Sequence, residues 1–199
     1  MNIRFEQSAL IEIDVQNDFC PGGALAVQDG DKIVPHLNEV AREFYAAGSP
    51  VIATQDWHPS GHCSFASSGR KAAQEEVLWP DHCVFGSMGA DFHPNLDTTG
   101  ITLIIRKGFR QNIDSYSAFF ENDRKTSTGL AYFLKGLSID TLYIGGLATD
   151  YCVYYSVMDA INLGFKVFVL KNAIRGVDYP AGSVEKAIGA MQSAGVIML

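Results

Sequence analysis

The chain has 199 residues, of which 47% are hydrophobic, so it is long enough to bury one core and short for two; we expect residues 1–199 to form a single domain. Its formal net charge is -7 and its basic residues are scattered, which argues against binding to nucleic acid or to an anionic membrane. No apolar run approaches the ~20 residues that span a bilayer, and the polar start Met1–Gln7 lacks a signal core, so we expect a cytoplasmic protein.

The first half of the chain begins with a strand, a helix and a second strand. The apolar run Ala9–Val15 predicts a buried strand. Apolar residues at helical spacing between Ile33 and Phe44 predict a helix with Asp31 as its candidate N-cap, and Pro50–Thr54 begins the second strand. From Asp56 to His93 the periodicity is lost in a stretch rich in Gly, Pro, Ser and His. A loop of this length in a compact domain is usually functional.

The second half continues the alternation of strands and helices. The predicted elements are, in order, a strand at Thr102–Arg106, a helix at Leu130–Lys135 with Ser and Thr caps, a strand at Asp140–Ile144, a helix at Asp150–Leu163, a strand at Lys166–Leu170, a helix through Val184, Ile188 and Met191, and a strand at Val196–Met198. Apolar strands separated by helices are typical of a parallel sheet that is covered on both faces. The pattern therefore predicts an α/β protein with three α/β/α layers around a central, mostly parallel sheet.

Chemically active side chains fall at or just after four predicted strand ends, namely Asp14, Asp56, Lys107 and Cys152. In an open parallel sheet, ligands bind beyond the carboxyl ends of the strands, so we expect these side chains to converge on one edge. The glycine pairs Gly22-Gly23 and Gly145-Gly146 match no dinucleotide or phosphate-loop fingerprint. We interpret both pairs as turns that let the backbone approach the site closely.

Cys152 lies in GGLATDYCV, at the start of a predicted helix, where the helix N-terminus favours the thiolate and lowers the thiol pKa. The free backbone N–H groups of that turn also offer an oxyanion hole. Together with Asp14 and Lys107, this thiol makes a set of nucleophile, base and stabiliser. Each residue also has a structural interpretation. Cys152 could be a core cysteine, Asp14 could cap the loop after the first strand, and Lys107 could be a solvated surface lysine.

Histidines gather in the long loop region. QDWHPSGHCSF contains Asp56, His58 and His62, and WPDHC adds His82. Aspartate and histidine together suit zinc, manganese or iron, so we expect a divalent metal site. The alternative is a structural zinc site, which would lack CxxC spacing and would use His62, Cys63, His82 and Cys83. Otherwise we expect the chain's four cysteines, Cys20, Cys63, Cys83 and Cys152, to remain reduced, because a chain of this size is stabilised by burial.

Six motifs in chain order resemble the isochorismatase-like cysteine hydrolases and, within that superfamily, the nicotinamidases. They are IDVQNDF (13–19), TQDWHP (54–59), WPDHC (79–83), RKG (106–108), DSYSAFF (114–120) and GLATDYCV (146–153). The resemblance extends from Ala9 to about Gly195. The pairing of DWH with WPDHC is what separates nicotinamidases from their metal-free relatives.

The resemblance implies a role for each site residue. The catalytic triad would consist of Asp14, Lys107 and Cys152. The metal ligands would be Asp56, His58 and His82, and in some members also the residue that matches His62. The oxyanion hole would be formed by the backbone N–H groups of Ala148 and Cys152, next to a cis peptide bond that precedes Ala148. The pyridine ring would be enclosed by Phe19, Trp79, Tyr116 and Tyr151.

The activity that the resemblance implies is hydrolysis of nicotinamide to nicotinate and ammonia through a cysteine thioester, in NAD salvage, with pyrazinamide as a further substrate. Asp14 would take the proton of Cys152 and return it to the departing ammonia. The metal, with zinc preferred over manganese or iron, would orient the ring. The expected partner is nicotinamide, and no binding to nucleic acid or to a membrane is expected. A homo-oligomer is left open. Two other functions stay open, another small-amide hydrolase of the superfamily and a non-catalytic metal-binding protein.

Overall fold

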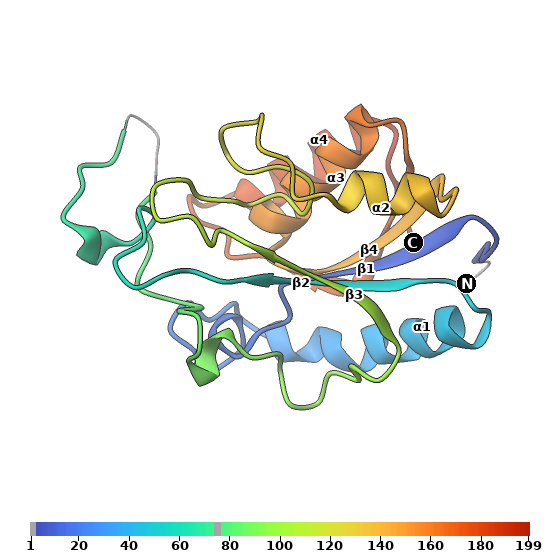
Figure 1. Ribbon diagram of the computed structural model, residues 1–199, viewed down its shortest axis with the longest axis horizontal. Coiled ribbons are helices and arrows are strands. Elements are labelled where there is room, and N and C mark those ends of the chain that lie inside the picture. The colour runs from blue at the N-terminus through green and yellow to red at the C-terminus, as the bar shows by residue number, and fades with distance from the viewer. Residues whose placement is uncertain (1–2, 74–76) are drawn as a thin grey trace.

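The computed structural model describes residues 3–73 and 77–199. Within these residues, six parallel strands form one sheet in the order β3-β2-β1-β4-β5-β6. The strands are β1 (Ser8–Ile13), β2 (Val51–Asp56), β3 (Ile101–Lys107), β4 (Thr141–Leu147), β5 (Lys166–Arg175) and β6 (Ile197–Met198). One face is covered by α1 (Val34–Ala46), and the other is covered by α2 (Leu130–Gly136), α3 (Tyr154–Asn162) and α4 (Ser183–Ser193) (Figure 1). The predicted three-layer α/β/α architecture is therefore confirmed.

The burial pattern of the strands follows from this layering. β1, β2 and β4 are buried at every position because helices cover both faces of the sheet. Successive residues of β1 point to opposite faces, so Ile11 joins the core beneath α2–α4 while Leu10 joins the core beneath α1. The edge strand β3 is fully buried only at Ile105 and Lys107. None of the helices in the described part of the chain has the length and apolar character needed to cross a membrane.

The predicted helix caps are wrong in detail. Asp31 lies in a 3₁₀ turn, η2 (Gly30–Ile33), which runs directly into α1, so Ile33 takes the N-cap position. Gly129 is the N-cap of α2. The hydroxyls of Ser127 and Thr128 nevertheless accept hydrogen bonds from the backbone N–H groups of Gly129 and Leu130. The two hydroxyls therefore accept hydrogen bonds from the amides at the start of α2, although both residues precede the helix.

Two strands also differ from their predicted extent. Gly145-Gly146 lies inside β4 rather than in a turn, whereas Gly22-Gly23 does lie in a turn region. At Gly146 φ is +133°, and a Cβ there would collide with the backbone of Ile13, so this glycine allows β1 and β4 to approach closely. β5 continues to Arg175, beyond the predicted end at Leu170. The extension begins with two exposed polar residues, which end the apolar run that predicted the strand.

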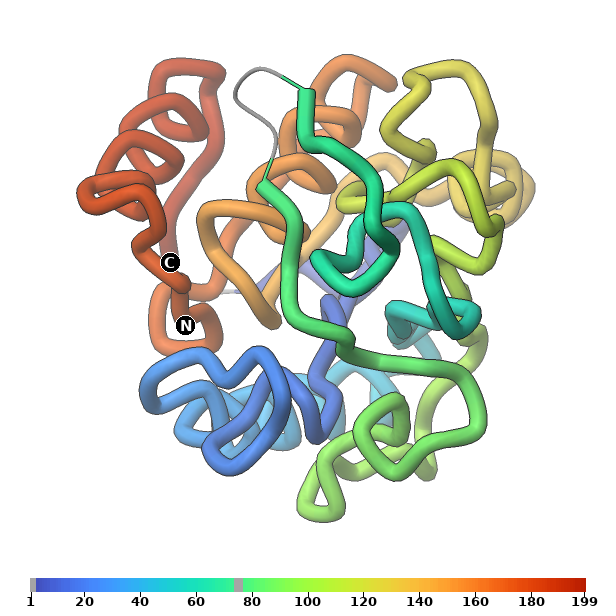
Figure 2. The backbone as a smooth tube through the Cα atoms, turned by 90° about the vertical axis from the view of Figure 1, so that its left-hand side faces the viewer, coloured from blue at the N-terminus to red at the C-terminus, as the bar shows by residue number. Residues whose placement is uncertain are grey.

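The carboxyl ends of the central strands lie at one end of the molecule, where the long loops gather (Figures 1 and 2). Figure 2 looks onto this end and shows the teal and green segments 57–73 and 77–95 crossing it, with the blue segment 15–30 below. Three 3₁₀ turns lie in these loops, η1 (Asn17–Phe19), η3 (Ala66–Ser68) and η4 (Met88–Ala90). The connection order of the sheet reverses between β1 and β4. In sheets of this kind the crevice at such a reversal is where ligands bind.

Candidate active site

The strand ends bring Asp14, Lys107 and Cys152 together. Asp14 follows β1, Lys107 is the last residue of β3, and Cys152 lies after β4 in a π-helical turn, η5 (Thr149–Val153), that leads into α3. The Lys107 Nζ atom lies 2.9 Å from Asp14 Oδ2 and 3.4 Å from Cys152 Sγ. The three side chains are buried, and Lys107 is only 1% exposed. Lys107 is therefore not a solvated surface lysine.

Asp14 is held by a partner that sequence reasoning missed. Its backbone N–H donates to Thr54 Oγ1 at 3.1 Å, and the Thr54 hydroxyl donates to Asp14 Oδ1 at 2.5 Å. The residue has a φ of +47°, a left-handed conformation that is uncommon for a non-glycine residue. Thr54 belongs to the TQDWHP motif, but only the pairing of β1 with β2 reveals its contact with Asp14. The Asp14 side chain thus faces Thr54 and Lys107.

Lys107 also connects Asp14 and Cys152 to the cluster of histidines. Its Nζ atom lies 2.5 Å from Asp56 Oδ1 and donates to the Ser115 carbonyl oxygen at 2.9 Å. Asp56 and Lys107 are register partners on β2 and β3, which fixes this contact. Burial opposes the charge on Lys107, but the carboxylates of Asp14 and Asp56 outweigh it and hold the lysine pKa well above its usual value. The ammonium therefore stays charged inside the protein.

The pKa of the Cys152 thiol is raised, whereas the sequence predicts a lowered pKa. Burial raises it well above the ordinary value, Lys107 opposes this rise, and the carboxylates of Asp14 and Asp56 add to it. The helix-terminus prediction of a lowered pKa was wrong, because it ignored the loss of water around a side chain that is only 6% exposed. Burial also raises the pKa of Asp14, against the lowering effect of Lys107. The candidate nucleophile is thus a neutral thiol beside a carboxyl group.

Asp56, His58 and His82 form a group suited to a metal ion. One ligand atom from each lies within 4.8 Å of the other two, and all three side chains are buried. His58 Nδ1 lies 2.8 Å from the Gly108 carbonyl oxygen, and His82 Nδ1 lies 2.7 Å from that of Pro80. A carbonyl oxygen can only accept a hydrogen bond, so each Nδ1 carries a proton, and in the neutral imidazole each Nε2 then carries the lone pair.

Both Nε2 atoms face the same carboxylate oxygen. Asp56 Oδ2 lies 3.6 Å from His58 Nε2 and 3.9 Å from His82 Nε2. Backbone carbonyls that fix the tautomer of two histidines beside an aspartate are the usual surroundings of a bound cation. Gly108 contributes a second constraint, since its φ is +64° and a Cβ on it would collide with the His58 ring.

His62 is oriented differently from the other two histidines. Its ring stacks on His58 with centroids 4.3 Å apart. Its Nδ1 atom accepts from the Ser64 N–H at 3.3 Å and lies 2.7 Å from Ser64 Oγ, while Nε2 lies 3.2 Å from the Ile113 carbonyl oxygen. The lone pair of His62 therefore faces Ser64.

The cysteines show no sign of the alternative zinc site. Among the described residues, the clusters of metal-ligating side chains include neither Cys63 nor Cys83. All four cysteines lie outside disulfides, as predicted. Burial raises the pKa of the Cys83 thiol well above its usual value, as expected of a cysteine in the core.

The four aromatic residues expected to enclose a ring line one narrow cavity of about 30 Å³. Its lining includes Phe19, Trp79, Tyr116 and Tyr151 together with Cys152, Ala148, Asp56, His58 and His82. The Trp79 indole N–H donates to the Tyr116 hydroxyl at 3.2 Å, and the rings of Trp79 and Tyr151 meet edge to face at 4.9 Å. The cavity thus joins a thiol, a group of side chains suited to a metal ion, and aromatic walls.

One other feature of this cavity was predicted from the sequence, and three of its lining residues were not. The peptide bond between Leu147 and Ala148 is cis, as predicted. Sequence reasoning did not single out Leu25, Asp114 or Val177, which also line the cavity. Of these, Asp114 opens the DSYSAFF motif, so a signal for it was present.

Comparison with known proteins identifies the family. Residues 8–199 match the model of the isochorismatase domain. A nicotinamidase of Acinetobacter baylyi is 46% identical over 208 residues, with 98% of this chain and 95% of the relative covered. Two solved structures are also similar. One is an L. infantum protein in complex with nicotinate, at a TM-score of 0.88 and 37% identity, with 100% of this chain and 95% of that one covered. The other is the pyrazinamidase of Pyrococcus horikoshii in complex with zinc, at a TM-score of 0.84 and 38% identity, with 97% of this chain and 98% of that one covered. The chain therefore belongs to the isochorismatase family of hydrolases, in the branch that contains the nicotinamidases.

Proposed function

We propose that this protein is a nicotinamidase, an amidohydrolase that converts nicotinamide and water to nicotinate and ammonia, and that residues 1–199 form one domain. The observation that carries the proposal is the convergence of Asp14, Lys107 and Cys152 on a cavity with aromatic walls and a group of metal ligands. The family and its nicotinamidase members support the same activity. Pyrazinamide, whose ring also carries a nitrogen meta to the carboxamide, fits as a second substrate.

In this proposal Cys152 is the nucleophile and Asp14 is the base. Asp14 takes the thiol proton as Sγ attacks the carboxamide carbon, and its pKa, raised by burial, makes it a stronger base than an exposed aspartate. The amide oxygen gains the negative charge and is held by the backbone N–H groups of Ala148 and Cys152. Lys107 stays charged throughout and stabilises the carboxylate and the developing thiolate.

The second half of the reaction regenerates the thiol. Protonated Asp14 gives its proton to the amide nitrogen, the carbon–nitrogen bond breaks and ammonia leaves, with the acyl group bound to Cys152 as a thioester. Water then attacks the thioester carbon as Asp14 accepts one of its protons. The carbon–sulfur bond breaks, the proton on Asp14 returns to the sulfur, and the acid product loses the second proton of the water to solvent and leaves as nicotinate.

The residues that would hold a divalent metal are Asp56, His58 and His82. They fit such an ion because two Nε2 lone pairs and a carboxylate oxygen converge, each histidine being oriented by a backbone carbonyl. Two imidazoles and a carboxylate suit zinc, with manganese or iron as alternatives. A bound cation would supply a Lewis acid that holds the ring nitrogen, directly or through water. The four aromatic side chains orient the ring so that the carboxamide faces Cys152.

The test is to incubate the purified protein with nicotinamide and to measure ammonia and nicotinate. We expect equal amounts of both, and none from Cys152→Ala. Benzamide, which has the amide but lacks the ring nitrogen, should be a poor substrate. No product from nicotinamide would refute the proposal. Equal rates on benzamide would instead point to a less selective amide hydrolase of the same family.

A further inference from the structure

Asp114 is a carboxylate next to the proposed metal ligands that the reaction above leaves without a role. It lies in the segment that follows β3, is partly buried, and lines the cavity together with Asp56, His58 and His82. One of its oxygens lies within 4.8 Å of a ring nitrogen of His58 and of one of His62. Within residues 3–73 and 77–199, we find no N–H or O–H group that donates a hydrogen bond to this carboxylate. Its acceptor oxygens are therefore available to a ligand in the cavity.

Asp114 and His62 are the two groups that extend the metal cluster beyond His58, and they differ in access. His62 is 0% exposed, does not line the cavity, and has both nitrogens engaged by Ser64 and Ile113. A cation at Asp56 and His58 would reach the His62 lone pair only if the contact with Ser64 were broken. The Asp114 side chain already faces the cavity. Of the two, Asp114 is the group placed to interact with such a cation.

The charges around the site also favour a second carboxylate close to a bound cation. Asp14 and Asp56 are buried beside the single ammonium of Lys107, so the three groups together carry one negative charge. A divalent cation bound there would leave one uncompensated positive charge in a buried site, which is costly. The carboxylate of Asp114 would neutralise it.

We propose that Asp114 is the second carboxylate of the metal centre, and that its charge and acceptor oxygens increase the affinity of the site for a divalent cation. This inference rests on the metal site of the proposed function. Groups that support metal ligands typically change metal affinity by about 10- to 100-fold when they are mutated. We expect a loss of that size for Asp114→Asn, which keeps the shape of the side chain and removes its charge.

The experiment measures zinc affinity directly. Protein stripped of metal is titrated with Zn²⁺ in competition with a chelating dye, and metal content at saturation is measured by mass spectrometry. Asp114→Asn should raise the Kd by about 10- to 100-fold and still bind one ion at saturation. Asp114→Glu, which keeps the charge, should stay closer to the wild type. Asp91→Asn removes an exposed carboxylate in the preceding loop and should leave the Kd within about twofold, as expected of an exposed charge.

Each other outcome has a defined meaning. His58→Ala should abolish stoichiometric binding. If it does so while Asp114→Asn keeps the wild-type Kd, the role of Asp114 is refuted and the metal site stands. Equal losses in the Asn and Glu variants would also refute a role for the charge. If the wild-type protein binds no metal yet hydrolyses nicotinamide, the metal site and the role of Asp114 both fail, while the cysteine mechanism survives.

Discussion

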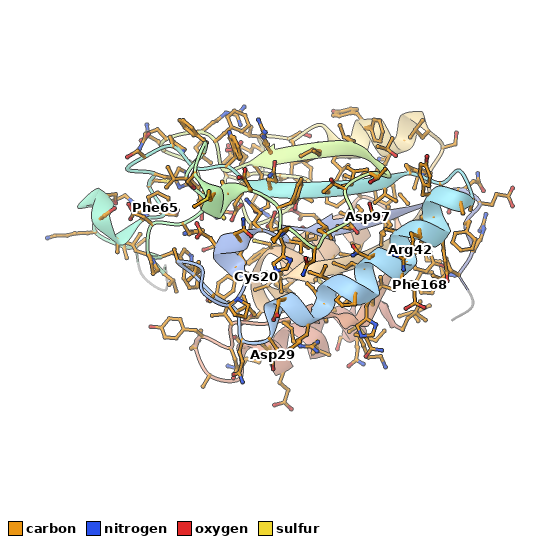
Figure 3. All side chains as sticks on the ribbon, turned by 90° about the horizontal axis from the view of Figure 1, so that it is seen from below. Cys20, Asp29, Arg42, Phe65, Asp97 and Phe168 are labelled. Atoms are coloured by element: carbon orange, nitrogen blue, oxygen red, sulfur yellow. The ribbon has the colours of Figure 1, made fainter. Side chains whose placement is uncertain are left out.

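Glu12 should make the protein less stable as the pH rises. It lies in the middle of β1 between Ala53 of β2 and Gly145 of β4, is 0% exposed, and neither carboxylate oxygen has a hydrogen-bond partner among the described residues. Burial raises its pKa from 4.5 to about 8, and the negative charge of Asp97 adds to this rise. Asp97 lies beside α1, near Arg42 (Figure 3). The folded protein therefore holds a proton on Glu12 that the unfolded chain releases near pH 4.5.

The sign and size of the effect follow from this difference. Below pH 4.5 Glu12 is protonated in both states and costs nothing through ionisation. Between pH 4.5 and about 8 the unfolded state alone ionises, so the free energy of unfolding falls by about 1.4 kcal/mol per pH unit. Above about 8 the loss levels off near ~5 kcal/mol. Glu12→Gln has no charge to lose and should lack this part of the slope.

The assay is urea unfolding at pH 5.5, 6.5 and 7.5. Relative to the wild type, Glu12→Gln should gain about 3 kcal/mol across this range, on top of any constant cost of its buried amide. Glu12→Leu, which buries no polar group, should show the same dependence if the amide variant folds poorly. Glu43→Gln removes an exposed carboxylate on α1 and is the matched control. Parallel pH profiles for the wild type and both Glu12 variants would refute the reasoning.

Three further predictions concern the site. Cys152→Ala should abolish hydrolysis of nicotinamide while leaving the unfolding midpoint and metal content near wild type; measurable steady-state turnover would contradict the covalent route. Asp14→Asn should lower kcat by at least about 100-fold with a smaller change in KM, as loss of a positioned base predicts, and retention of most activity would make Asp14 a structural residue. Gly108→Ala should reduce bound zinc measured by mass spectrometry, because its Cβ would displace His58; Gly48→Ala, at a similar φ of +71° but with open space, is the control and should keep its metal.

Much of the fold and the positions of the site residues could be predicted from the sequence. Strands such as Val51–Asp56 and Ile101–Lys107 were found within a few residues, because a sheet covered on both faces needs apolar strand runs. The convergence of Asp14, Lys107 and Cys152 was also predicted, because parallel strands bring their carboxyl ends to one edge. The proposed metal ligands Asp56 and His58 were indicated by residue type and motif.

What only the tertiary structure decided depends on backbone geometry and on the removal of water. Glu12 was part of an apolar run in the sequence, and only the covered sheet leaves its carboxylate buried with no hydrogen-bond partner in the described part of the chain. The orientation of His58 depends on the Gly108 carbonyl, and a carbonyl acceptor has no side-chain signature. The pKa of Cys152 is raised, against the helix-terminus expectation, because burial outweighs the lowering effect of Lys107. Residue types and their order therefore determined which groups meet, whereas packing decided their protonation and orientation.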